Sequence, residues 1–501
     1  MDCESQSLFT ITCATLTDRS RFLQAKVQLE YVCNFKSDGA IKAALRNLPS
    51  GLDDTYEQVL SDILQKTPAE AEIVRTILKW LFGSYYLLTP SELAEAVSIQ
   101  PEDTFLDIEM IATDPEDLVA LCRSLVVIDR SHDPPLVSLT HFTVKEYLRS
   151  DRLANSSASF FHMTESQVHL DLAVICTQYL AFRDFADTAP LATLATFDAT
   201  ALLIRRYVLL HYAAEHWAKH IKASKLCKDD FERAIRPRLQ WFLQPDVDGH
   251  NYSSWQSVWY YGVPENEQWD FGCFHELPFY HAILLGLEPV FDILLPQVSS
   301  INDRFKDDWT PLTAALKMRR LGIARKLLDA GADPNIAAGK NRNALTPLHV
   351  AAENGLEDMA ELLLNIGADP HARTITETTP MYRAARGGSL RIMQMLHELG
   401  CDVNARTWDN WTAIFDPVLR NRIDLLEQLL LWDADCNITT RQGVTPFSLA
   451  LSLGREQIVQ ILADKTSPEC QKARTTPLCG DEFDYRSFLT SQKALSPQEA
   501  V

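Results

Sequence analysis

A unit centred on threonine recurs through the second half of this 501-residue chain, and it constrains the fold more than any other feature. Its copies start at Thr310, Thr346, Thr379, Thr412 and Thr445, so the successive spacings are 36, 33, 33 and 33 residues. A second signature, a Gly-Ala-Asp-like triplet, follows some twenty residues after each of the first four threonines. Two motifs that share one register over several copies predict a series of repeated structural units.

Each unit is predicted to fold as a pair of short helices. Threonine before the first helix accepts a backbone N–H as N-cap, and the proline that follows it needs no N–H at the first helical position. Gly331, Gly367 and Gly400 follow the second helix of their units and supply the positive φ that ends it. One helix pair cannot bury its apolar face alone, so the units must stack on one another.

The copy Thr346–Ala351 reads Thr-Pro-Leu-His-Val-Ala, and this pattern resembles the box of the ankyrin repeat in full. The resemblance implies an α-solenoid in which His349 ties neighbouring turns together, a role in stability. An upstream stretch around Pro278 is interpreted as a degenerate first repeat. We therefore predict about six ankyrin repeats over residues 271–465.

One copy departs from the pattern. It has Ala413 in place of the proline, Pro417 where a small residue is usual, and Asp433 in place of the terminating glycine. We therefore expect its first helix to be bent or short, because proline inside a helix removes a hydrogen bond and clashes with the preceding turn. We also expect a loosely packed point in the stack.

The first half of the chain is predicted to be helical with one β-hairpin. Helical segments are expected before residue 98 and at 117–124, and two short strands at 125–129 and 136–140 flank a turn with two prolines. A further helix is expected at 143–150. Helices, a hairpin and another helix in this order predict a winged-helix unit over 85–152, within a protein that is mainly α.

Three segments carry a second resemblance, namely Arg21–Lys26, Leu48–Tyr56 and His141–Leu148. Together they resemble the fungal NACHT–ankyrin proteins, which are relatives of the NOD-like receptors. The resemblance implies that residues 21–84 correspond to the end of a NACHT module. However, the chain has no G-x-x-x-x-G-K-[ST] sequence, and the Gly339-Lys340 pair is followed by Asn341. We therefore expect a truncated relative without ATPase activity, or alternatively a fragment of a longer gene product that carries the phosphate-binding loop.

The charge balance excludes several classes of partner. The chain has 47 basic and 67 acidic residues, a net charge of −20, and the predicted winged helix is itself acidic. Such a surface repels phosphate backbones, so we expect no nucleic-acid partner.

No apolar run reaches the ~20 residues of a membrane span. The 11 cysteines form no C-x-x-C pair, which is typical of reduced thiols, and we expect a cytoplasmic protein, with a nuclear location as the alternative.

Two clusters are candidate ligand sites. His216 and His220 are four residues apart on a predicted helix and could reach one metal ion, but His211 is off that face. We interpret these histidines as structural and expect no metal, cofactor or catalytic residues. Aromatic residues are dense between Trp241 and Phe274, and we interpret them as a hydrophobic joint between the helical domain and the first repeat.

The variable positions of the repeats remain as the candidate site. Ankyrin stacks bind protein partners through hairpin tips and the concave face of the inner helices, and here several arginines and tryptophans occupy those positions within an acidic protein. The candidate partner-binding residues are Trp309, Lys317, Met318, Arg342, Glu353, Asn354, Glu377, Arg383, Arg386, Arg406, Trp408, Asn410, Trp411 and Arg441.

These observations favour a non-enzymatic scaffold that binds proteins, in fungal signalling or non-self recognition. An accessory protein of a fungal specialised-metabolite pathway is the alternative. The predicted organisation is a tail (1–20), a NACHT-like helical segment (21–84), a winged helix (85–152), a helical domain with the aromatic joint (153–270), the ankyrin repeats (271–465) and a disordered tail (466–501). The oligomeric state is left open.

Overall fold

The computed structural model describes residue 28 and residues 51–185, 197–244, 251–261, 278–305, 308–339 and 344–468. The chain divides into two compact units, an N-terminal unit (Met1–Val263) and a C-terminal unit (Pro264–Val501), and each is described by itself. The predicted tail at 1–20, most of the segment 21–50 and residues 469–501 lie outside the described residues. Among the described residues, no helix is both long and apolar enough to cross a lipid bilayer.

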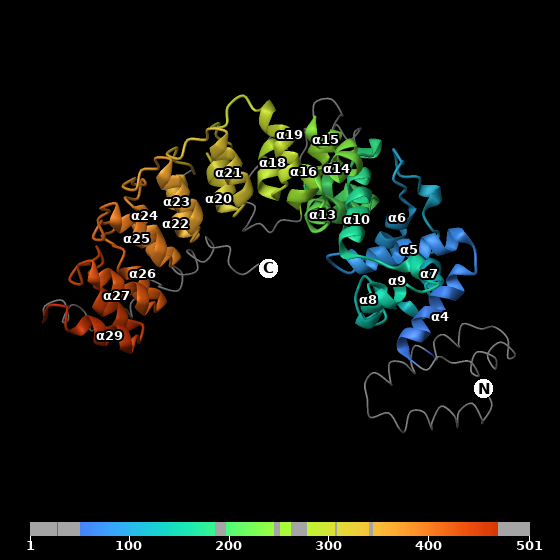
Figure 1. The fold of residues 1–501 in the computed structure, drawn as a ribbon, viewed down its shortest axis with the longest axis horizontal. Coiled ribbons are helices and arrows are strands. Elements are labelled where there is room, and N and C mark those ends of the chain that lie inside the picture. Colours follow the sequence, from blue (N-terminus) through green and yellow to red (C-terminus); the bar gives the residue numbers. More distant parts are fainter. Residues whose placement is uncertain are drawn as a thin grey trace, which may run out of the picture. The chain divides into compact units, whose positions relative to one another are not determined.

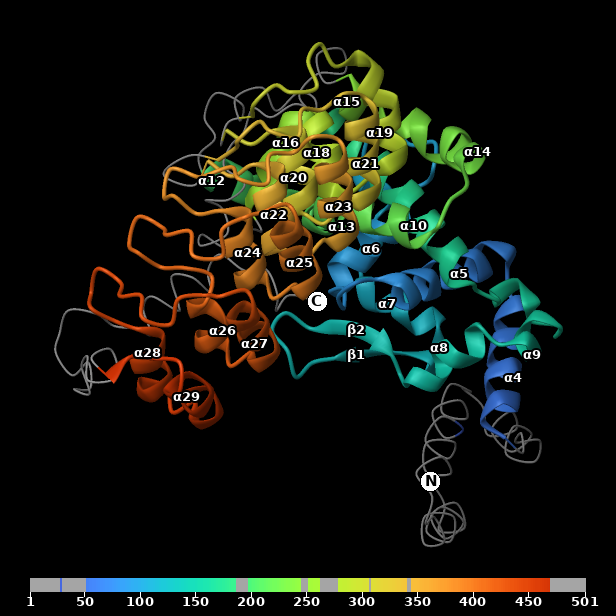
Figure 2. The same ribbon diagram turned by 60° about the vertical axis from the view of Figure 1, so that its left-hand side comes forward.

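The described part of the N-terminal unit starts with helices that lead into a β-hairpin. Its first described elements are α4 (Leu52–Leu64), α5 (Pro68–Gly83), α6 (Pro90–Ser98), the 3-10 turn η1 (Ile108–Met110), α7 (Pro115–Leu121), η2 (Arg123–Leu125), β1 (Val126–Asp129), β2 (Leu136–Leu139) and α8 (Phe142–Leu148). The strands are antiparallel, with Val126 opposite Leu139, and the hairpin lies beside α8 (Figure 2). This order confirms the predicted winged helix. Thr89 caps α6 in a reciprocal capping box with Glu92.

A helical layer follows the winged helix. Its described elements are α9 (Asp151–Ala154), η3 (Ser159–Phe161), α10 (Glu165–Leu180), η4 (Arg183–Phe185), α12 (Phe197–Arg206), α13 (Leu210–Ala223), α14 (Lys228–Asp230), the π-helix η5 (Phe231–Ile235), η6 (Arg236–Leu239), α15 (Gln240–Leu243) and α16 (Asn251–Tyr261). Helix α10 packs on α13 and α5, and α13 packs on α16.

The core of this layer is aromatic. The rings of Trp217, Phe242 and Trp255 are fully buried, with centroids 5.4 Å apart for Trp217 and Phe242 and 6.2 Å apart for Trp217 and Trp255. Trp241 packs edge-on against Trp217. Part of the predicted aromatic joint therefore lies inside the core of the N-terminal unit, whereas its last rings (Trp269, Phe271 and Phe274) lie outside the described residues.

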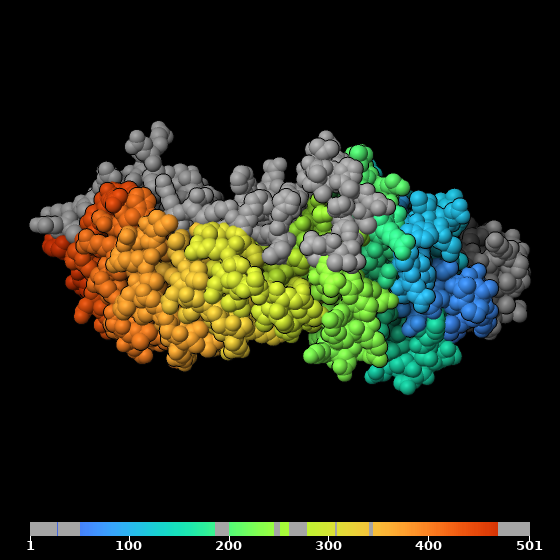
Figure 3. Space-filling view, turned by 90° about the horizontal axis from the view of Figure 1, so that it is seen from above, coloured from blue at the N-terminus to red at the C-terminus, as the bar shows by residue number. Residues whose placement is uncertain are grey.

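The described part of the C-terminal unit contains six helix pairs in succession, with one further 3-10 turn (η7, Leu295–Gln297) (Figure 1). The pairs are α18 (Pro278–Leu285) and α19 (Glu288–Leu294), α20 (Pro311–Lys317) and α21 (Leu321–Asp329), α22 (Pro347–Glu353) and α23 (Glu357–Asn365), α24 (Pro380–Gly387) and α25 (Leu390–Glu398), α26 (Phe415–Arg420) and α27 (Ile423–Leu431), and α28 (Pro446–Ser452) and α29 (Glu456–Ala463). In the space-filling view they follow one another as bands from yellow to red (Figure 3). This arrangement confirms the predicted solenoid.

The box residues act as the sequence predicts. Thr310, Thr379 and Thr445 accept the N3 backbone N–H of their helices. His349 is fully buried, with Nδ1 2.8 Å from Thr346 Oγ1 and Nε2 3.1 Å from the carbonyl oxygen of Thr378 in the next repeat. The imidazole therefore links two neighbouring repeats.

The copy that departs from the pattern has a shortened helix. Without a proline after Thr412, helix α26 starts only at Phe415, and Thr412 Oγ1 is buried with no hydrogen-bond partner among the described residues. Asp433 adopts a positive φ of 58° at the position where the three preceding repeats have Gly331, Gly367 and Gly400. The expected loose packing is not observed, because Phe415 and Val418 are fully buried.

Asparagine side chains join successive hairpins. Asn335 donates from Nδ2 to the carbonyl oxygen of Gly367 at 3.0 Å and accepts the N–H of Asp369 at 2.8 Å. Asn404 makes the corresponding pair of bonds at 3.1 and 2.7 Å. At the equivalent position between them stands His371, and among the described residues its ring makes no such bonds to the next repeat.

We expect the substitution His371→Asn to stabilise the stack. It supplies the missing pair of hydrogen bonds at an exposed site, which corresponds to a gain of about 1 kcal/mol in the free energy of unfolding. The reverse substitution, Asn404→His, should cost a similar amount. Urea unfolding followed by circular dichroism measures both. Equal unfolding midpoints for the His371→Asn variant and the unaltered protein would contradict this assignment.

Candidate partner-binding surface

The exposed part of the predicted surface lies at the hairpin tips. The positions four residues before the last three repeat threonines are occupied by Ile375, Trp408 and Arg441, which we call the tip row. Ile375 is 66% exposed and Trp408 is 49% exposed, so both large apolar side chains face solvent. The guanidinium of Arg441 lies over the Trp408 ring, 5.2 Å from its centroid. The row therefore presents an aliphatic, an aromatic and a cationic side chain on consecutive repeats.

The backbone holds neighbouring tips together. The N–H of Trp408 donates to the carbonyl oxygen of Thr376 at 3.1 Å, and the N–H of Arg441 donates to that of Asp409 at 3.2 Å. The amide of Gln442 also bonds both carboxylate oxygens of Asp409, at 3.1 and 3.0 Å. A surface whose side chains are already ordered loses less conformational entropy when a partner binds.

Two predicted residues occupy the turn at the tips. Glu377 and Asn410 both have a positive φ, 59° and 60°, at the position where the last hairpin has Gly443. Glu377 is exposed and forms an ion pair with Arg373 at 2.9 Å. Few residues other than glycine adopt this backbone conformation without strain. Glu377 and Asn410 therefore determine the shape of the turn as well as facing solvent.

The predicted arginines on the inner helices lie in an ion-pair cluster. Arg383 Nη1 is 2.8 Å from Glu353 Oε2, and Arg386 Nε is 3.4 Å from Glu353 Oε1. Arg383 is only 7% exposed, and its Nε is buried without a hydrogen-bond partner. Therefore Arg383 is not the freely exposed side chain that the variable position suggested. Glu353 belongs to the preceding repeat, 30 residues earlier, so this pairing links two repeats.

Asp416 extends this cluster into the next repeat. Its carboxylate is buried, and Oδ1 lies 3.8 Å from Arg420 Nε. Burial raises the pKa of Asp416, while the nearby Arg386 and Arg420 oppose the shift. The inner face near these helices is therefore an electrostatic network that holds repeats together.

The remaining predicted residues are distributed along the stack. Lys317 Nζ lies over the Trp309 ring at 4.5 Å, and Trp411 packs against Phe415 with centroids 4.8 Å apart. The carbonyl oxygen of Asn354 accepts a bond from Arg319 at 2.6 Å. Arg406 is exposed and Met318 is half-buried. Arg342 lies outside the described residues.

The sequence reasoning missed Ile375. It is an apolar residue in a polar hairpin, and the prediction relied mainly on charged and aromatic side chains. Its spacing of 33 residues from Trp408 was a usable signal, since equivalent positions of neighbouring repeats lie side by side.

The histidines considered as metal ligands lie in a buried cluster of the N-terminal unit. His220 Nδ1 is 2.9 Å from His169 Nδ1, and His220 Nε2 is 2.8 Å from the hydroxyl of Tyr212. Both ring nitrogens of His216 are buried without hydrogen-bond partners, and the Tyr85 ring packs against all three imidazoles. Within the described ranges, no three His, Cys, Asp or Glu residues are arranged to hold a metal ion.

Burial decides the protonation of these histidines. Loss of hydration lowers the pKa of His220 to about 3 and also lowers the pKa values of His216 and His169. The three rings are therefore neutral at neutral pH. His169 was not identified from the sequence, because it lies 51 residues away from His220 on a different helix.

Comparison with known families agrees with both halves of this description. Residues 279–374 and 348–441 match a family model described as ankyrin repeats, and residues 60–161 match the model of the winged helix domain of GPI inositol-deacylase. The chain therefore contains ankyrin repeats and a winged-helix domain. Both kinds of domain are generally non-catalytic, and ankyrin repeats support a role in protein interaction.

Similar proteins cover parts of the chain. An "Azaphilone pigments biosynthesis cluster protein L" from Monascus ruber is 27% identical over 312 residues, which are 58% of this chain and 61% of that protein. "Ankyrin repeat and SOCS box protein 16" from Mus musculus is 39% identical over 101 residues, 19% of this chain and 22% of that protein. The chain thus spans less than two thirds of the length of either relative.

Acidification is expected to destabilise the N-terminal unit through the histidine cluster. Between pH 6.5 and the lowered pKa values the unfolded chain binds protons that the folded chain does not, so stability falls as the pH drops through 6.5. For His220 alone the loss between pH 7.5 and 5.0 is about 2 kcal/mol.

The variant His220→Gln keeps polar atoms near Tyr212 and His169 but does not titrate, so it should lose less stability over the same range. Urea unfolding at both pH values measures this difference. Glu95, whose pKa is raised mainly by burial, acts in the opposite direction in both proteins and therefore cancels in the comparison. An equal loss in both proteins would show that His220 does not contribute.

Removing Arg383 should destabilise the ankyrin stack. The variant Arg383→Ala leaves a partly buried Glu353 with Arg386 as its remaining ion-pair partner, and we expect a loss of about 2 kcal/mol in unfolding free energy. Arg391→Ala is the matched control, since its pair with Glu361 at 3.7 Å is more than half exposed. That control should change stability by less than about 0.5 kcal/mol. Equal midpoints for the two variants in thermal unfolding would refute the structural role of Arg383.

Proposed function

We propose that this protein is a non-catalytic scaffold that binds a protein partner through the hairpin tips of its ankyrin unit. The observation that carries the proposal is the tip row, in which Ile375, Trp408 and Arg441 are held in line by backbone bonds. Tryptophan and arginine are the residue types enriched in the energetic centres of protein interfaces. An apolar row with a cation on it fits a partner whose surface is apolar and acidic.

We further propose an accessory role in a fungal specialised-metabolite pathway. The support is the similarity to a protein from Monascus ruber whose name places it in a pigment biosynthesis cluster. The role consistent with the repeats is to hold a pathway protein, without a chemical step of its own. The cytoplasm, with the nucleus as the alternative, is the proposed location.

A role in signalling or non-self recognition is the second candidate. It rests on the segments that resemble NACHT–ankyrin proteins and on the winged-helix match over residues 60–161. In that case the chain is a relative of the switch ATPases that works through its sensor end, or a part of a longer switch protein. The two candidates use the same binding surface and differ in the partner they require.

The test compares two triple variants of the full chain as baits in fungal cell extract. The tip variant carries Ile375→Ser, Trp408→Ala and Arg441→Ala. The control carries Leu431→Ser, Leu399→Ala and Arg391→Ala, which remove equally exposed side chains at or near the second helices of the repeats. Both variants keep the ion-pair cluster around Arg383, so neither should disturb the stack.

We expect the unaltered protein and the control to capture the same partner, and the tip variant to lose it. Measured with the purified partner, the affinity of the tip variant should fall by at least about 30-fold, which corresponds to about 2 kcal/mol. Mass spectrometry of the captured protein distinguishes a biosynthetic enzyme from a signalling component. Equal capture by all three baits would rule out the tip row as the binding surface.

A further inference from the structure

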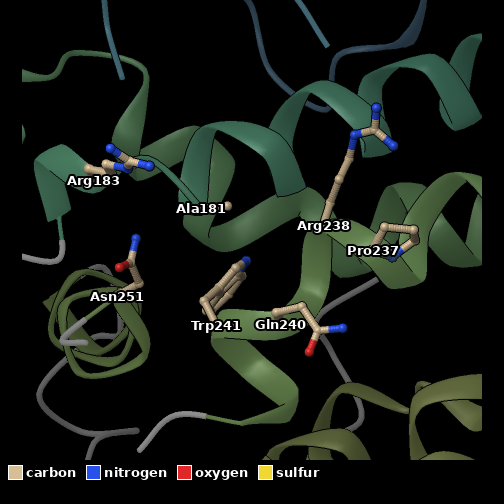
Figure 4. A pocket seen from close by; sticks show the side chains of 7 residues that line it. All are labelled: Ala181, Arg183, Pro237, Arg238, Gln240, Trp241 and Asn251. Carbon is tan, nitrogen blue, oxygen red and sulfur yellow. The ribbon is translucent and has the colours of Figure 1, made fainter. Parts of the chain in front are cut away.

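The proposed function assigns no role to a cavity of the N-terminal unit or to the end of the ankyrin stack. The cavity, of about 320 Å³, is lined by side chains that include Arg183, Arg238 and Asn251 (Figure 4). The two arginine side chains point apart in this view, and the Asn251 amide donates to the carbonyl oxygens of Leu180 and Phe182. These groups do not converge on one ligand, whereas the end of the stack presents apolar side chains on a defined face.

We propose that this face is covered by a segment of the chain itself, residues 469–489, which we call the cap segment. The face belongs to the last described helix pair, α28 and α29. Along the stack, each first helix packs against the first helix of the next pair, from α18 to α28. No described helix follows α29 in the chain, so the side of α28 that earlier first helices turn towards the next repeat is left over.

The position six residues after the repeat threonine shows how much the next repeat covers. In four preceding repeats this position is occupied by Leu316, Ala352, Ala385 and Val418, and each of them is at most 1% exposed. In the last repeat it is occupied by Leu451, which is 44% exposed. Removing a leucine side chain from water is favourable, so this position attracts an apolar segment.

The second helices show the same change at the position fourteen residues after the threonine. There Ala324, Ala360, Met393 and Leu426 are fully buried, whereas Val459 is only half-buried. One apolar position on each helix of the last pair is therefore open where a further repeat would lie. Repeat proteins need a terminal element to cover such an end.

The chain leaves α29 along the path that begins a further hairpin. In the preceding repeat, Asn404 Oδ1 accepts the N–H of Asp435 at 2.7 Å, and Asn437 Oδ1 accepts the N–H of Ser467 in the same way, also at 2.7 Å. Thr466 is 5% exposed and takes the place of the buried Ala434. The residues after α29 therefore lie as the first residues of another repeat do, and they direct the cap segment towards the open face.

The sequence of the cap segment continues this register. In the preceding repeat the box threonine follows the hairpin aspartate by ten residues, and Thr476 follows Ser467 by nine. The sequence that starts at Thr476 is Thr-Pro-Leu, the beginning of the repeat box. Phe483, Phe488 and Leu489 add apolar side chains that can cover the face.

The cap segment is shorter than a complete repeat. Gly480 and Asp481 take the places of Leu449 and Ala450 in the preceding box, and both residue types disfavour the interior of a helix. The segment therefore corresponds to a hairpin and one capped turn that lie against Leu451, in place of the disorder expected for residues 466–501. Terminal repeats are commonly atypical in this way.

Hydrogen–deuterium exchange of the full chain, followed by mass spectrometry, tests whether the cap segment is docked. The variant Leu451→Asp places a charge on the face at a position that is already partly exposed, so the repeat should stay folded. We expect the amides of residues 478–489 to exchange at least about tenfold more slowly in the unaltered protein than in this variant, because a docked segment exchanges only when it opens. The control Leu431→Asp changes a leucine that is 75% exposed in the preceding repeat, and it should leave this exchange unaltered.

A reciprocal pair of variants changes only the tail. Thr476→Gly combined with Leu478→Asp should speed the exchange of the amides of α28 and α29, whereas Thr490→Gly combined with Leu495→Asp, beyond the cap segment, should not. Exchange of residues 478–489 at the rate of an unfolded chain in the unaltered protein, or protection that persists in Leu451→Asp, would overturn the proposal. Protection that rises with protein concentration, together with a doubled mass in light scattering, would identify a second copy as the occupant and would also overturn it.

Discussion

The structure of the C-terminal unit depends on one constraint, that no single helix pair has a core of its own. Leu348, Leu363 and Ile392 are fully buried only because neighbouring repeats cover them. The same stacking brings residues 33 positions apart in sequence side by side, and it sets the tip row in line. The candidate binding surface is therefore a consequence of how the core is buried. A change that loosens the stack also moves the tips.

The features that could be predicted from the sequence are those that depend on local rules. The period, the helix pairs, the threonine caps and the order of elements in the winged helix all follow from spacing and capping, and the short α26 was expected from Ala413 and Pro417 in that repeat. The structure adds the pairings between distant segments. His169 meets His220 across 51 residues on two different helices, and no periodicity signals this contact.

The groups that an arginine side chain contacts show whether the residue is structural or available for binding, and they show this better than the residue type does. Arg383 and Arg386 share the carboxylate of Glu353, so their charges are already used within the stack. Arg441 lies on the Trp408 ring instead, and this contact does not neutralise the guanidinium. Attraction for an acidic group of a partner therefore remains available at Arg441.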